Sequence, residues 1–95
     1  MLRITIDEAP QTLTIILEGR LTGAWVAELG QAWKKAAQRR NGRAVSLDLR
    51  SLLWADEEGK RLLREIEEQT GAELVATTLW TKHLAAEIAG NNQND

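Results

Sequence analysis

The longest run of acidic side chains in the sequence is Asp56-Glu57-Glu58. It follows directly on an apolar run that contains Trp54 and ends at Ala55. An exposed tryptophan beside concentrated charge suits a binding surface, because tryptophan is enriched at hot spots and charge steers an oppositely charged partner. If Trp54 instead turns into the core, the carboxylates only favour the start of a helix. The pattern therefore predicts recognition of another molecule, with both orientations of Trp54 left open.

Catalytic and metal-binding patterns are weak in comparison. Asp48 and Asp56 end a predicted strand and begin a predicted helix, where two carboxylates could bind a cation or form an acid–base pair, but no further residue supports that use. His83 is the only histidine and cysteine is absent, so we expect His83 at the surface. Phosphate-binding glycine motifs and a nucleophile elbow are also absent. We therefore expect no enzyme activity, no metal and no cofactor.

Length and composition indicate one domain in a reducing compartment. Ninety-five residues leave no room for a second core, and the lack of cysteine fits the cytoplasm. No apolar run is long enough to span a membrane. Residues 1–50 hold eight Lys or Arg against five Asp or Glu, whereas residues 51–95 hold four against nine. An acidic chain with one basic half is a poor candidate for nucleic-acid binding.

Hydrophobic periodicity places these residues on a β-β-α-β-α-β-α chain. Period-two alternation or a short apolar run predicts four strands, at residues 2–6, 13–17, 44–50 and 73–77. Gly19 should close the second strand, and residues 51–55 should form an apolar connection. Crossover connections from strand to helix place the helices over a mixed sheet. We expect one domain over residues 1–90 and a disordered tail over residues 91–95.

Cap residues and apolar spacing define three helices, at residues 22–40, 56–70 and 79–89. The first should bury Val26, Leu29, Trp33, Ala36 and Ala37. Asp56 and Thr78 are N-cap residues, and Gly71 is suited to a helix end. The cluster of Lys34, Lys35, Arg39 and Arg40 lies where cations favour the end of the first helix, and the alternative is a patch for an anion or a partner.

Three segments together resemble the STAS domain, the fold of bacterial anti-sigma factor antagonists. They are Leu17-Glu18-Gly19-Arg20-Leu21, Val45-Ser46-Leu47-Asp48-Leu49, and Trp54-Ala55-Asp56-Glu57-Glu58-Gly59 with the following Leu62-Leu63 and Gly71-Ala72-Glu73-Leu74. The resemblance covers residues 2–90. It implies a single α/β domain with a mixed four-stranded sheet and helices packed on that sheet.

In that family, a partner kinase phosphorylates the hydroxyl residue that follows the loop aspartate, and this switches binding to an anti-sigma factor. Glu57 occupies the equivalent position here, and its carboxylate cannot be phosphorylated by a Ser/Thr kinase. Glu57 either mimics the modified state permanently or simply suits a helix start. The resemblance implies a partner-binding surface at Arg50, Ser51, Trp54, Asp56, Glu57, Glu58 and Arg61.

The expected function is that of a non-catalytic interaction module that resembles an anti-sigma factor antagonist. Its partner would be an anti-sigma factor or a related kinase-like protein. The alternatives are an accessory subunit of a membrane transport complex and a domain that senses an anion or nucleotide at the Asp56 helix start. We expect no nucleic acid and no membrane insertion, and we leave open a weak homodimer.

Overall fold

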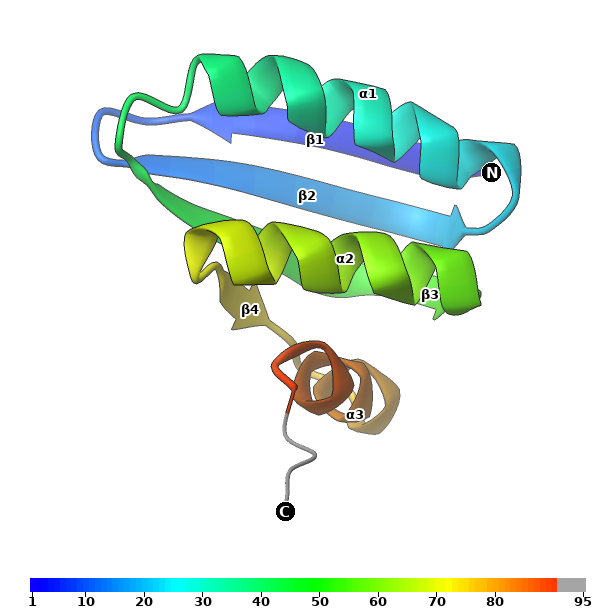
Figure 1. Ribbon diagram of the computed structural model, residues 1–95. Coiled ribbons are helices and arrows are strands. Elements are labelled where there is room, and N and C mark those ends of the chain that lie inside the picture. The colour runs from blue at the N-terminus through cyan, green and yellow to red at the C-terminus, as the bar shows by residue number, and fades with distance from the viewer. Residues whose placement is uncertain (91–95) are drawn as a thin grey trace.

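The structure is a computed structural model that describes residues 1–90, so the predicted tail at residues 91–95 lies outside the described residues. Its elements follow the predicted order (Figure 1). They are β1 (Leu2–Glu8), β2 (Thr12–Leu21), α1 (Ala24–Gln38), β3 (Ala44–Ala55), α2 (Glu57–Thr70), β4 (Glu73–Val75) and α3 (Leu79–Ile88).

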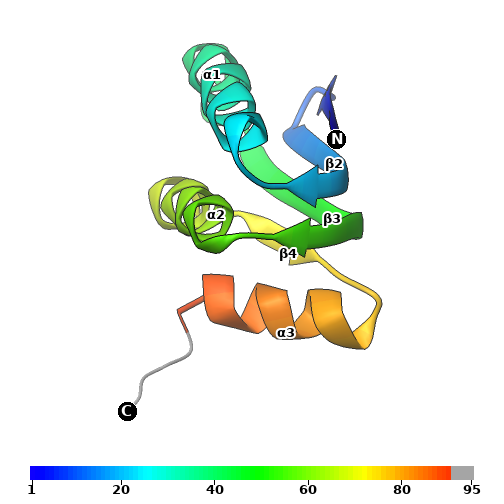
Figure 2. The ribbon, with the colours of Figure 1, turned by 90° about the vertical axis from the view of Figure 1, so that its right-hand side faces the viewer.

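The sheet is mixed, as predicted, and its strands lie in the order β1-β2-β3-β4. β1 and β2 pair antiparallel, while β2–β3 and β3–β4 pair parallel. Figure 2 shows α1 and α2 on one side of the sheet and α3 beyond β4. The protein is therefore a single α/β domain. None of the described helices is long and apolar enough to cross a membrane.

β2 and β3 are both longer than the sequence indicated, and in β3 β-bulges interrupt the alternation. Gly19 adopts a φ of 108° within β2, and the strand continues to Leu21 instead of closing at Gly19. β3 continues through residues 51–55, which were expected to form a connection. The register shifts by one residue between Ile16 and Glu18 and again after Gly19, so β3 carries two extra residues opposite β2. The alternation of apolar and polar residues along β3 is therefore lost at the bulges, although the strand itself continues to Ala55.

The core lies between the sheet and the helical layer. In α1 the buried side chains are Leu29, Trp33 and Ala36, whereas Val26 is half-buried and Ala37 is exposed. The prediction for Ala37 was wrong, because the buried stripe centres on Leu29 and a residue eight positions further is rotated by about 80° from it. The Trp33 Nε1–H donates to the Gln69 side-chain oxygen at 3.3 Å, which ties α1 to α2.

The helix caps confirm the predicted boundaries of α2 and α3. Asp56 caps α2, and Gly71 ends it in the left-handed conformation with φ of 66°. Thr78 and Thr81 form a capping box at the start of α3, where each side chain bonds the other residue's amide. Both helices therefore begin at positions that were read from the sequence.

Candidate interaction surface

The carboxylate of Asp56 joins the starts of two helices at the carboxyl ends of β2 and β3. Its Oδ1 accepts a hydrogen bond from the Gly59 amide at 2.8 Å, and its Oδ2 accepts one from the Gly23 amide at 3.1 Å. Gly23 is the N-cap residue of α1 and provides no side-chain cap. The Gly59 amide, followed by the Gly23 amide, holds the pKa of the Asp56 carboxyl below its usual value. Asp56 is therefore a structural link between α1 and α2.

Gly59 allows the first turn of α2 to rest directly on the end of β2. A Cβ atom at this position would lie 2.8 Å from the Leu21 carbonyl oxygen and 2.9 Å from the Leu21 Cγ. The same carbonyl oxygen accepts a hydrogen bond from the Asp56 amide at 3.1 Å, so the backbone is held in place. This close approach fixes where the start of α2 lies relative to the sheet.

Glu57 and Glu58 face solvent at this helix start. The Glu57 side chain is 86% exposed, and the Lys60 ammonium lies 3.6 Å from its carboxylate. Lys60 also lies 3.4 Å from Glu87 of α3, so two carboxylates share one cation. A guanidinium nitrogen of Arg61 donates to both Glu58 oxygens, at 3.0 and 2.9 Å. The candidate residues Glu57, Glu58 and Arg61 therefore lie together on the surface.

Trp54 adopts neither of the two expected orientations fully. Its side chain stacks on Trp80 of α3, with ring centroids 5.8 Å apart and an interplanar angle of 18°. Trp54 nevertheless stays 46% exposed, and the neighbouring Leu53 and Leu79 are 68% and 91% exposed. The end of β3 and the start of α3 thus expose large apolar side chains around this stacked pair, and we call the four residues the tryptophan patch: Leu53, Trp54, Leu79 and the half-buried Trp80.

Arg50 and Ser51 lie further back along β3. Because the strand continues to Ala55, Arg50 lies about 20 Å from Asp56 along an extended backbone. The Arg50 guanidinium donates to both Asp48 carboxylate oxygens, at 3.0 and 2.8 Å, and these bonds hold the pKa of Asp48 below its usual value. Ser51 is exposed. The structure therefore brings five of the seven candidate residues to one end of the strand and leaves these two along its length.

The proposed Asp48–Asp56 pair does not form. The two residues are eight positions apart on one continuous strand and its following cap, or about 25 Å, and each bonds different groups. His83 is an exposed residue whose Nε2 lies 3.9 Å from Glu87. Within residues 1–90, no three His, Asp or Glu side chains are grouped so that they could hold a metal ion.

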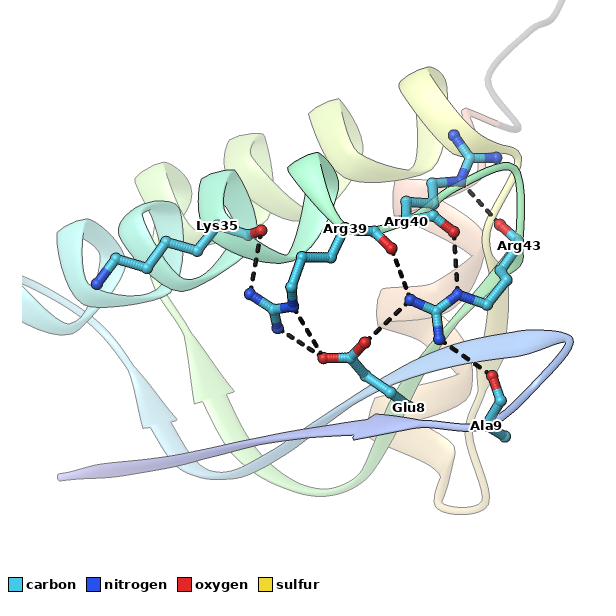
Figure 3. A network of polar contacts seen from close by, with 6 residues as sticks. All are labelled: Glu8, Ala9, Lys35, Arg39, Arg40 and Arg43. Atoms are coloured by element: carbon cyan, nitrogen blue, oxygen red, sulfur yellow. Dashed lines mark hydrogen bonds and ion pairs between the residues drawn. The ribbon is translucent and has the colours of Figure 1, made fainter.

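The arginines at the end of α1 bind within the protein, as Figure 3 shows, whereas the Lys34 and Lys35 ammonium groups are exposed and pair with no described residue. Arg39 donates to the Glu8 carboxylate at 3.1 and 2.7 Å and to the Lys35 carbonyl oxygen at 3.3 Å. Arg43 donates to the other Glu8 oxygen at 2.9 Å and to the Arg39 carbonyl oxygen at 2.6 Å. Arg39 and then Arg43 lower the pKa of Glu8. These bonds to helix carbonyls agree with the expected role in ending α1.

Sequence reasoning missed the part that α3 contributes to this surface. Trp80, Leu84 and Ile88 are spaced four residues apart and share the inward face of the helix. Leu79 falls outside that face, which was the available signal that it would be exposed. The pairing of Trp80 with Trp54 had no such signal, because it joins residues from two elements.

Comparison of the fold connects this chain to a solved structure, whereas comparisons of the sequence find no match. No family model and no curated protein match it. Its structure is similar to the crystal structure of an anti-sigma factor antagonist from Mycobacterium paratuberculosis, with a TM-score of 0.79 and 16% sequence identity. The match covers 95% of this chain and 79% of that chain. The chain therefore has the STAS-like fold of an anti-sigma factor antagonist, as its sequence led us to expect.

Proposed function

We propose that this protein is a cytoplasmic, non-catalytic module that binds a protein partner in the manner of an anti-sigma factor antagonist. The fold supports this role, because the similar solved structure is an anti-sigma factor antagonist. The surface that we assign to the partner combines the start of α2 with the tryptophan patch. The observation that carries the proposal is the 86% exposure of Glu57, at the position that the resemblance gives to a phosphorylated hydroxyl.

Glu57 gives this position a permanent negative charge. A phosphate would add about −1.5 to −2 and could be removed again, whereas a carboxylate stays. The Lys60 ammonium lies 3.6 Å from Glu57 and is shared with Glu87, so it neutralises Glu57 only in part. In this proposal the module has a single binding state, which no Ser/Thr kinase alters at residue 57.

The tryptophan patch supplies the apolar part of the same surface. Large aromatic side chains in a well-packed interface carry a large share of the binding energy, while rim charges mainly raise the association rate. A matching partner would present an apolar pocket for Trp54, bordered by lysine or arginine residues that face Glu57 and Glu58.

The charges at the start of α2 favour this use over the binding of an anion or a nucleotide. The Gly59 amide is already bonded to Asp56, and Glu57 and Glu58 occupy the first turn. An anion would meet three carboxylates where an anion site needs free amides. A basic protein surface has the complementary charge.

The proposal is tested by identifying a partner and then measuring its affinity for single variants. The immobilised full chain would capture partners from a native lysate for mass spectrometry, and calorimetry would give Kd for the purified pair. We expect Trp54→Ala to weaken binding at least about tenfold, as at a hot spot. Glu57→Ser should change Kd and introduce a hydroxyl that a cognate kinase can phosphorylate.

Glu68→Ser is the matched control, because Glu68 is an exposed glutamate further along the same helix. It should leave Kd unchanged. An anti-sigma factor as the captured protein would support the proposal, whereas a transporter subunit would favour the accessory role instead. A partner bound equally well by wild type, Trp54→Ala and Glu57→Ser would show that this surface is not the interface.

A further inference from the structure

The two edges of the sheet differ in how they are closed. β4 has only three residues, and α3 lies beyond it (Figure 2). β1 has seven residues and is the last strand at the other edge, where no further described strand pairs with it and α1 runs alongside it on one face of the sheet (Figures 1 and 2). α1 packs against one face of this part of the sheet, and no described residue hydrogen-bonds the outward backbone groups of Ile4 or Ile6. An open edge strand offers a row of backbone donors and acceptors to another strand.

The register of β1 shows which backbone groups face outward. The Arg20 amide donates to the Met1 carbonyl oxygen, and the Ala9 amide donates to the Thr12 carbonyl oxygen, both at 2.9 Å. Hydrogen-bonded and non-hydrogen-bonded pairs alternate along an antiparallel ladder. Odd-numbered residues of β1 therefore bond β2, and the backbone groups of the even-numbered residues point away from it.

We propose that two copies of this chain pair antiparallel through β1, about a two-fold axis at Thr5. The inference does not depend on the proposed function, because the tryptophan patch and the start of α2 lie away from this edge. The outward backbone groups belong to even-numbered residues. The backbone of Ile4 therefore hydrogen-bonds the backbone of Ile6 in the second copy, and that of Ile6 hydrogen-bonds Ile4 in the second copy. The sheet then continues through eight strands.

This register brings opposite charges together. Arg3 lies opposite Asp7 of the second copy, and Asp7 opposite Arg3, at non-hydrogen-bonded pairs where Cα atoms are about 4.5 Å apart. Both side chains are exposed, and neither makes a hydrogen bond or an ion pair to a described residue of its own chain. The two neighbouring symmetric registers place Thr5 opposite Arg3 or opposite Asp7 and lose this double pairing. Charge complementarity therefore selects a second copy in one register.

The other face of β1 is complementary as well. Ile4 and Ile6 are half-buried and pack against the core, so their remaining apolar surface is exposed at the edge. In the paired sheet each contacts the other residue in the second copy and extends the core across the seam. β1 also contains no proline, lysine or bulge, which are common means of protecting an edge strand.

Charge exchange tests the pairing in solution. Sedimentation equilibrium of the full chain up to about 1 mM should show a dimer, since this range includes weak complexes. Arg3→Asp and Asp7→Arg should each weaken dimerisation at least about tenfold, because each places two pairs of like charges at the seam. The combined variant should restore it. Lys82→Asp is the control, because it makes the same charge change as Arg3→Asp at an exposed position of α3. It should leave the dimer unchanged.

Cross-linking tests the register, because the natural chain contains no cysteine. Thr5→Cys places two thiols face to face on the axis, within the Cα separation that a disulfide accepts. Mild oxidation should convert this variant to a covalent dimer, while Ala86→Cys on exposed α3 should react slowly. The proposal would be overturned by any one of three results. These are a wild type that stays monomeric throughout, a combined charge variant that does not dimerise, and equal cross-linking by both cysteine variants.

Discussion

The two ends of the parallel strands both carry concentrated charge, yet they differ in how that charge is used. At the end where β3 begins, Arg39 and Arg43 bind the Glu8 carboxylate and helix carbonyl oxygens (Figure 3). At the end where β3 stops, Glu57 is 86% exposed beside the tryptophan patch. Charge density along the sequence is similar in both places. The contacts, rather than the density, show that the two arginines at the first end are paired with Glu8, whereas Glu57 shares its one cation with Glu87.

At the end where β3 stops, neighbouring carboxylates also differ in whether they are bonded within the protein or exposed. Asp56 bonds the amides of Gly59 and Gly23 and holds two helices together. Glu57 follows directly and bonds only a shared lysine. One residue along the chain therefore separates a carboxylate that stabilises the fold from a carboxylate that faces solvent.

The largest effect on this comparison is expected from Gly59→Ala, which would disrupt the end where β3 stops. The new methyl group would lie 2.8 Å from the held Leu21 carbonyl oxygen, closer than van der Waals contact, and should lower the free energy of unfolding by about 1–3 kcal/mol. Gly30→Ala is the control, because the nearest atom to its methyl group is 3.9 Å away, and it should stabilise by about 0.5–1 kcal/mol. Urea denaturation measures both. Equal stability of Gly59→Ala and wild type would contradict the close packing.

Acid should lower the free energy of unfolding through one carboxylate at each end of the parallel strands, and salt should distinguish the two carboxylates. The pKa values of Asp56 and Glu8 are lowered on folding, so each contributes stability above its unfolded pKa and loses it as the pH falls through its folded pKa. Between about pH 5 and pH 2, stability should fall less steeply in Asp56→Ala and Glu8→Gln than in wild type. About 1 M salt should remove most of the effect of Glu8→Gln, because exposed ion pairs are screened.

Hydrogen bonds from backbone amides are less sensitive to salt, so Asp56→Ala should stay destabilised at the same salt concentration. Thermal unfolding over pH and salt gives both comparisons. If salt removed the two effects equally, the distinction between an amide-bonded carboxylate and an ion-paired carboxylate would fail.

The smallest effect is expected from Glu58→Gln. Glu58 and Arg61 are 65% and 63% exposed, so their ion pair should contribute little, and the free energy of unfolding should change by less than about 0.5 kcal/mol. Chemical denaturation checks this. A loss larger than that of Glu8→Gln would mean that the solvent-facing carboxylates support the fold and are not reserved for binding.

Local chemistry was sufficient to predict the order of elements and most of their ends. Asp56, Gly71 and Thr78 act on amides and carbonyl oxygens within about four residues, so their roles can be read without knowing the fold. Period-two and helical spacing likewise report which side of an element is buried. These signals were enough to predict a mixed four-stranded sheet and three helices.

Contacts between distant segments decided the rest. The full length of β3 depends on bulges opposite β2, which remove the alternation that would have identified the strand. The separation of Arg50 from Asp56 follows from that length, and the stacking of Trp54 on Trp80 depends on where α3 packs. The sequence determined which local structures form and where charge is concentrated. Only the tertiary structure decided that Arg39 and Arg43 neutralise Glu8 and which strand lies at the edge, because those outcomes depend on neighbours that are dozens of residues away along the chain.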